Sequence, residues 1–111
     1  MYYICDYREI PRIKRVRIEY FNEDEDIEVE DVWIKDTVSY KAAMKNVIRT
    51  INKILDSKFE IRKYNGKEYL VQNDVKLNEL ESGWECEHNF CSNLIVLAKH
   101  VEDEIVQFEL I

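Results

Sequence analysis

Glycine and proline are scarce in this chain of 111 residues, which holds two glycines and one proline. A loop that wraps phosphate groups with backbone amides needs several closely spaced glycines. Gly66 and Gly83 lie far apart, and each falls in a predicted turn. The sequence therefore excludes nucleotide binding through a glycine-rich loop.

Cysteine and long apolar runs are also in short supply. The three cysteines are an odd number, which argues against a disulfide framework. The longest apolar run, residues 94–98, is far shorter than a membrane span. The first residues lack the basic start and apolar run of a secretory signal. We therefore expect a soluble, cytoplasmic protein without a membrane partner.

The overall residue usage points to a source. Ile, Lys, Asn, Glu and Tyr are abundant, whereas Ala, Gly and Pro are few, which indicates coding biased towards A and T. Such coding suits a low-GC bacterium or one of its phages. The expected compartment is the cytoplasm of a bacterium or of a phage-infected host cell.

The clearest element is a long amphipathic helix predicted over residues 36–57, with Asp36, Thr37 or Ser39 as its cap. Its apolar residues recur three and four positions apart and form one stripe: Tyr40, Ala43, Met44, Val47, Ile48, Ile51, Ile54 and Leu55. The other side carries a basic ridge, made of Lys41, Lys45, Arg49 and Lys53. The simplest interpretation of this ridge is a solvated face. The alternatives are an anion contact or pairing with acidic segments.

Strands are predicted before this helix, over residues 2–7, 13–21 and 27–34. Residues 16, 18 and 20 alternate with charged residues, and so do residues 27 and 29. The phase slips after Glu30, which predicts a β-bulge at Glu30–Asp31. An antiparallel register with Tyr20 opposite Ile27 would pair Arg17 with Glu30.

After the helix, residues 59–64 and 67–72 flank Asn65-Gly66, the dipeptide that a type I′ hairpin turn favours. Residues 74–82 are predicted to form a short helix or irregular turn. Residues 94–101 fit a buried strand better than a helix, although Phe90, Leu94, Leu97 and Val101 also have helical spacing. Residues 105–111 are predicted as the last strand.

These elements predict a single α+β domain over residues 1–111. One antiparallel sheet of about five to seven strands would carry the long helix on one face. The expected order is β-β-β-α-β-β-(short α)-β-β.

The net charge is −7, from 23 acidic and 16 basic residues. Nucleic-acid binding depends on neutralising phosphates with Lys and Arg, so we expect no direct nucleic-acid partner. The acids concentrate in residues 22–36 and 74–111, which favours attraction to a basic protein.

The first acidic segment is the predicted partner-binding site. It holds seven acids and no base between residues 23 and 31, and an interface-forming tryptophan follows it. The predicted contact residues are Glu23, Asp24, Glu25, Asp26, Glu28, Glu30, Asp31 and Trp33. An acidic hairpin that only discourages edge-to-edge aggregation is the equally weighted alternative.

The resulting hypothesis is a small acidic, non-enzymatic protein that blocks a basic surface of a protein partner, such as a nucleic-acid-binding or nuclease surface. Antitoxins, immunity proteins and phage anti-defence or anti-CRISPR inhibitors work in this manner. This comparison rests on size, charge and the source inferred from residue usage, and not on matched residues. Homo-oligomers are compatible with it.

A second hypothesis is a metal or small-ligand site around Cys86, His88 and Cys91, beside Trp84. A zinc site needs four ligands, usually in two close pairs, so His100 or Cys5 would have to complete the set. The spacing Cys-x-His-x-x-Cys is not a standard zinc motif. A third hypothesis is a structural subunit of a phage or cellular complex. We expect no cofactor and no catalytic residues, because no triad or complete ligand set can be traced.

Overall fold

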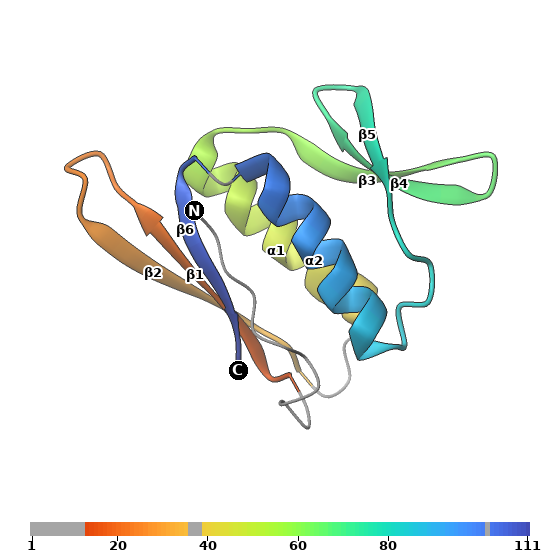
Figure 1. Ribbon diagram of the computed structural model, residues 1–111, viewed down its shortest axis with the longest axis horizontal. Helices are drawn as coiled ribbons and strands as arrows, with labels where there is room; N and C mark the ends of the chain where they lie inside the picture. Colours follow the sequence, from red (N-terminus) through yellow and green to blue (C-terminus); the bar gives the residue numbers. More distant parts are fainter. Residues whose placement is uncertain (1–12, 36–38, 102) are drawn as a thin grey trace.

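The computed structural model describes residues 13–35, 39–101 and 103–111. The described elements are β1 (Arg15–Phe21), β2 (Ile27–Trp33), α1 (Tyr40–Leu55), β3 (Phe59–Tyr64), β4 (Lys67–Gln72), β5 (Val75–Glu79), α2 (Glu87–Val101) and β6 (Ile105–Leu110). The predicted α+β class is confirmed. The predicted single sheet is wrong, because the strands form two antiparallel sheets of three, in the orders β2-β1-β6 and β3-β4-β5. The two helices run side by side between these sheets (Figure 1).

Helix α1 confirms the central prediction, although it is shorter than the expected 36–57. Ser39 caps its start, and the Ser39 hydroxyl accepts a hydrogen bond from the Ala42 amide at 3.2 Å. Asp56 ends it in the left-handed conformation, with φ of 51°. The other proposed caps, at positions 36 and 37, lie outside the described residues. Most of the predicted apolar stripe is buried, namely Ala43, Met44, Val47, Ile48 and Ile51.

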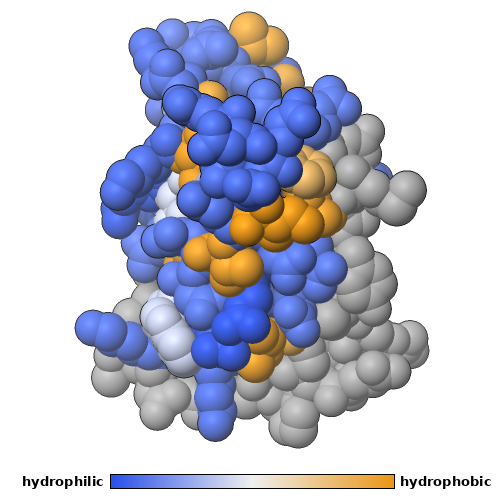
Figure 2. Space-filling view, turned by 90° about the vertical axis from the view of Figure 1, so that its left-hand side faces the viewer, coloured by the Kyte–Doolittle hydropathy of each residue, from blue (hydrophilic) through white to orange (hydrophobic). Residues whose placement is uncertain are grey.

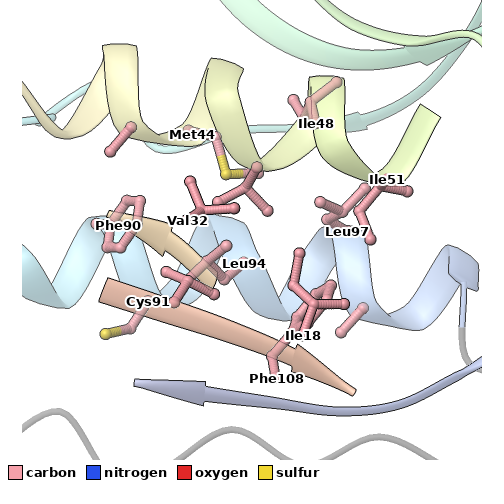
Figure 3. Close-up of a cluster of buried hydrophobic side chains, with 14 of the residues drawn as sticks. Ile18, Val32, Met44, Ile48, Ile51, Phe90, Cys91, Leu94, Leu97 and Phe108 are labelled. Carbon is pink, nitrogen blue, oxygen red and sulfur yellow. The ribbon is translucent and has the colours of Figure 1, made fainter. Parts of the chain in front are cut away.

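The main core lies between the two helices and the β2-β1-β6 sheet. Side chains from α1, α2, β1, β2 and β6 meet there, as Figure 3 shows for Met44, Leu94, Ile18, Val32 and Phe108. Four of these five side chains are fully buried, and Val32 is only 7% exposed. Burial of this apolar surface is the main force that holds the first sheet against the helices.

The strand predicted at residues 94–101 is wrong, because these residues belong to helix α2. The residues with helical spacing, Phe90, Leu94, Leu97 and Val101, are all buried on one face. The helix also has an acid in its first turn and Lys99 and His100 in its last turn, which suits the helix dipole. Strands and buried helices both contain short apolar runs, so the run itself was ambiguous.

Residues 74–82 correct another prediction, because Val75–Glu79 forms strand β5 and not a short helix. Gln72 pairs with Val75 across a two-residue turn, and Asn73 and Asp74 both have positive φ, 51° and 65°. These are the dihedral signs of a type I′ turn, which Asn and Asp tolerate. The Asn-Asp dipeptide was therefore a hairpin signal in the sequence.

The hairpin at Asn65-Gly66 is confirmed, with the predicted register. Ile61 lies opposite Leu70, and Lys63 lies opposite Glu68. Both turn residues have positive φ, 50° at Asn65 and 81° at Gly66. The predicted last strand is also confirmed as β6, which pairs with β1. The strand predicted at residues 2–7 lies outside the described residues.

The β1–β2 hairpin is confirmed as a hairpin, but its predicted register is wrong by one residue. Phe21, not Tyr20, lies opposite Ile27, and Arg17 pairs with Asp31, not with Glu30. The pairing runs without a shift from one end of the hairpin to the other, so the bulge expected at Glu30–Asp31 is absent from it. A shift does occur between β1 and β6, at Glu19/Tyr20.

Candidate interaction site on the β1–β2 hairpin

The loop between β1 and β2 sets the register of the hairpin, and Asn22 organises that loop. The Asn22 side-chain oxygen accepts hydrogen bonds from the amides of Asp24 and Asp26, at 2.9 and 3.0 Å. The Asn22 amide donates to the carbonyl of Asp26 at 2.9 Å. Glu25 takes a left-handed conformation, with φ of 62°. These bonds place Asn22 opposite Asp26 and therefore Phe21 opposite Ile27.

A one-residue change of register exchanges the two faces of a strand. The even-numbered residues of β2 consequently share a face with Ile18 and Tyr20. Val32 is buried on that inner face, whereas Glu28 and Glu30 are exposed on it. Ile27 and Val29, which the predicted register would have placed beside the core, point to the outer face of the sheet.

The predicted contact residues therefore divide into three groups. Glu23, Asp24, Glu25 and Asp26 are exposed at the tip of the hairpin. Glu28 and Glu30 lie on the inner face, while Asp31 and Trp33 lie on the outer face with Arg15 and Arg17. None of the six carboxylates at the tip and on the inner face forms an ion pair with a described residue.

Asp31 differs from the other six acids because its charge is already neutralised. Arg17 donates two hydrogen bonds to its carboxylate, at 2.9 and 3.3 Å, and Arg15 lies 3.7 Å away. The hydrogen bonds from Arg17 lower the pKa of Asp31, and the same contact raises the pKa of Arg17. The guanidinium of Arg15 also lies over the Trp33 ring, 4.9 Å from its centroid. Asp31 therefore holds the outer face together and is poorly available to a partner.

Glu28 is held in place by its neighbours. Its carboxylate accepts a hydrogen bond from the Tyr20 hydroxyl at 3.0 Å and one from the Asn22 side chain at 3.2 Å. Burial raises the pKa of Tyr20, and the contact with Glu28 raises it further. The hydroxyl therefore remains a donor, which fixes the Glu28 carboxylate on the inner face.

A cleft of about 790 Å³ lies between the hairpin and α1. Its hairpin wall includes Tyr20, Glu23 and Glu30, and its helix wall includes Arg49 and Lys53. Asp103 and Glu104 also line the cleft. The half of the basic ridge that faces this cleft thus opposes the acidic hairpin without contacting it in an ion pair.

The opposite end of the basic ridge has a structural role. Lys41 forms an ion pair with Glu68 of β4 at 2.5 Å, so α1 is tied to the second sheet. Glu68 lies outside both acidic segments, residues 22–36 and 74–111. The ion pair of Lys41 is therefore not the expected pairing between the basic ridge and an acidic segment. Lys45 is exposed, and Arg49 donates a hydrogen bond to the Asn46 side chain at 2.9 Å.

The outer face of the hairpin holds a feature that the sequence pattern missed. Four large apolar side chains are about half exposed: Phe21 at 49%, Ile27 at 56%, Val29 at 49% and Trp33 at 59%. They extend along β2 and across to the end of β1, on the same side of the sheet. Figure 2 shows apolar patches within a largely hydrophilic surface on this side of the molecule. The five-residue loop with Asn22 at its start was the signal that would have placed these residues outside.

The residues of the metal hypothesis lie at the start of α2. Cys86 precedes the helix and is exposed, and its carbonyl accepts a hydrogen bond from the Phe90 amide at 3.1 Å. His88 is exposed on the first turn, whereas Cys91 is buried against the core. Within the described ranges, no group of three or more His, Cys, Asp and Glu residues is arranged to hold a metal ion.

Comparison with protein-family models, curated proteins and solved structures found no match to this chain. Among the described residues, no helix combines the length and the apolar character needed to cross a membrane.

Proposed function

We propose that this protein is a small, non-enzymatic inhibitor or binding protein whose β1–β2 hairpin occupies a basic surface on a protein partner. The observation that carries the proposal is the composition of the hairpin. It presents half-exposed Phe21, Ile27, Val29 and Trp33 on one face, and six carboxylates without ion-pair partners among the described residues at its tip and on its other face.

Apolar and aromatic side chains surrounded by charged groups are the usual composition of a protein interface. Exposed apolar side chains are individually common, but four large ones on one face of a hairpin are typical of an interaction surface. The carboxylates contribute a second property, since a block of like charge accelerates the encounter with an oppositely charged partner. The apolar face would supply affinity, and the acids would supply the encounter rate and the selectivity for a basic partner.

A basic partner surface of this kind is typical of proteins that bind or cut nucleic acids. Blocking such a surface is the mode of action that we propose, in the cytoplasm of a bacterium or of a phage-infected cell. The proposal needs no cofactor and no catalytic residue in this chain.

The test reverses the charge at the tip of the hairpin. The variant Asp24→Lys, Glu25→Lys, Asp26→Lys leaves the loop intact, because these three residues bond to Asn22 through their backbone groups and not through their side chains. A matched control, Glu79→Lys, Glu81→Lys, Glu85→Lys, makes the same change of net charge on exposed residues away from the hairpin.

In a capture experiment, proteins that bind to immobilised wild type but not to the immobilised tip variant are identified by mass spectrometry. Their binding is then remeasured with purified components. We expect the tip variant to associate about tenfold or more slowly at low salt, with the difference shrinking at high salt. The matched control should associate nearly as fast as the wild type. Equal association rates for the tip variant and the control would refute the proposal.

A further inference from the structure

Strand β2 is an outer strand of its sheet, because the order of the described strands is β2-β1-β6. One edge of its backbone therefore has no partner strand among the described residues. The pattern of hydrogen bonds to β1 shows which backbone groups lie on that edge.

In an antiparallel pair, opposed residues alternate between pairs that exchange backbone hydrogen bonds and pairs that do not. Both ends of this hairpin show a bonded pair of even-numbered residues. The Ile34 amide donates to the Lys14 carbonyl at 2.7 Å, and the Asn22 amide donates to the Asp26 carbonyl at 2.9 Å. The register between them is continuous, so the even-numbered residues of β2 bond to β1. The amides and carbonyls of the odd-numbered residues, Ile27, Val29, Asp31 and Trp33, point away from β1.

These same odd-numbered residues carry the apolar side chains of the outer face. An added strand would thus bond to residues whose side chains are apolar, apart from Asp31, which Arg17 already neutralises. Its alternate side chains would fall on the inner face, beside Glu28 and Glu30. The chemistry of the two faces therefore specifies an alternating pattern in the strand that fits.

A second copy of this chain does not have that pattern. If two β2 strands paired antiparallel with even residues opposite even residues, Glu28 and Glu30 would face the same carboxylates of the other copy. If even residues lay opposite odd residues, these carboxylates would lie against Ile27 and Val29. Like charges directly opposite each other, or charges set against apolar side chains, are both unfavourable. Charged side chains on an edge strand commonly prevent such self-association.

We propose that the β2 edge receives an extended segment of the protein partner as an added antiparallel strand, in which apolar residues alternate with Lys or Arg. The apolar side chains lie over Ile27 and Val29, and the basic ones lie beside Glu28 and Glu30. This inference rests on the proposed function, because it describes how the hairpin recognises its basic partner. Strand addition of this kind takes affinity from the backbone and specificity from the alternate side chains.

The test uses synthetic peptides as probes. The first alternates lysine with valine, and the second has the same composition with the lysines and valines in separate blocks. Two more peptides carry the alternating sequence with N-methyl groups, either on every valine or on every lysine. N-methylation removes a backbone donor without changing the charge.

We expect the alternating peptide to bind wild-type protein about tenfold or more tightly than the block peptide, because only the former can bond along the edge while matching both faces. N-methylation of the valines should abolish this gain, since their amides face β2, and N-methylation of the lysines should not. Glu30→Lys should weaken binding of the lysine peptide and strengthen binding of a peptide that alternates glutamate with valine.

Hydrogen exchange provides an independent readout. The amides of Ile27, Val29 and Trp33 should exchange quickly in the protein alone and slow down when the alternating peptide binds. Slow exchange of these amides before any peptide is added would overturn the inference, because the edge would already be covered.

The outcomes separate this inference from the proposed function. If alternating, block and N-methylated peptides all bind equally, and binding falls in the tip variant, the acidic hairpin still attracts basic chains but strand addition is wrong. If none of them binds wild-type protein, strand addition is likewise refuted, while the capture experiment with the tip variant still decides the proposed function.

Discussion

Glu68 is the only charged side chain that is buried among the described residues, and its environment explains why it remains ionised. Lys41 forms an ion pair with one of its oxygens, and the Trp84 ring nitrogen donates to the other at 2.9 Å. Burial by itself would raise the pKa of Glu68, but the hydrogen bonds from Lys41 and Trp84 outweigh it, so the pKa is lowered. One carboxylate therefore joins β4 to α1 and to the segment before α2.

This residue predicts how stability depends on pH. A carboxylate with a lowered pKa in the folded state stabilises the fold above its ordinary pKa of 4.5, and that contribution is lost as the pH falls through the lowered value. Glu68→Gln should reduce the free energy of unfolding by about 1–3 kcal/mol at neutral pH. Below pH 4.5 the difference from the wild type should shrink.

Urea unfolding of both proteins across the acidic range measures this effect. Glu81→Gln, at an exposed position, is the control and should follow the wild type at every pH. A constant difference between Glu68→Gln and the wild type from neutral to strongly acidic pH would contradict the assigned ionisation.

At the scale of elements, two asparagine side chains fasten the helices to the chain beside them. Asn52, on α1, accepts a hydrogen bond from the Phe59 amide at 2.8 Å and donates to the Phe59 carbonyl at 2.9 Å. Asn93, on α2, does the same for both backbone groups of Glu81, at 2.8 and 3.0 Å. Each asparagine thus satisfies both backbone groups of one residue, which is the first residue of β3 at Phe59 and a residue of irregular backbone at Glu81.

Asn93 offers the sharper test because it is buried, with 1% of its surface exposed. Asn93→Leu should lower the free energy of unfolding by about 1–3 kcal/mol, because two backbone groups lose their partners. It should also accelerate hydrogen exchange of the Glu81 amide. Lys99→Ala, on the exposed side of the same helix, should change stability by less than about 0.5 kcal/mol. Unchanged hydrogen exchange of the Glu81 amide would show that the two bonds from Asn93 do not hold this residue in place.

Elements whose signals are local could be predicted from the sequence, whereas features that depend on distant parts of the chain could not. Helix α1 and the Asn65-Gly66 hairpin were predictable because their signals are local, namely an apolar stripe and a turn dipeptide. The division into two sheets was not, because it depends on which strands pair across long stretches of chain. The conformation of residues 94–101 depended on burial between partners that only the tertiary structure supplies.

Sequence reasoning named the acidic residues of the candidate site, but it missed the exposed Phe21, Ile27 and Val29 and the geometry of the hairpin. The acidic run and Trp33 were identified from charge and composition, and whether they bind a partner stays a prediction. The loop around Asn22 decided which side chains face outward, and its five-residue geometry was not inferred from the pattern. A slip of one residue was enough to assign Ile27 and Val29 to the wrong face.

At the scale of the whole molecule, the two sheets differ in how far apart their strands lie in the sequence. β3, β4 and β5 are consecutive and joined by two-residue turns. In the other sheet, β1 pairs with β6, which is the last element of the chain. Figure 1 shows these two strands together although almost the entire chain separates them.

This arrangement has a consequence for the order in which structure is gained. Closing a long loop costs entropy before the contacts that it allows can compensate, so distant pairings form late. We expect the consecutive hairpins and α1 to be structured in the folding transition state and the β1–β6 pairing to complete afterwards. Phe108→Ala in β6 should therefore accelerate unfolding with little change in the folding rate, whereas Leu70→Ala in β4 should slow folding. Both side chains are fully buried, so the two variants are a fair comparison.

Stopped-flow refolding and unfolding in urea would measure both rates for each variant. A large fall in the folding rate of Phe108→Ala would mean that β1 and β6 pair early in folding. If the expected order holds, the β1–β2 hairpin is the last part of the molecule to be anchored, because β1 completes its pairing only when β6 is added to the sheet. A newly made chain would then carry its acidic hairpin on an incomplete sheet until β6 has been made, and recognition of a partner would depend on the presence of β6.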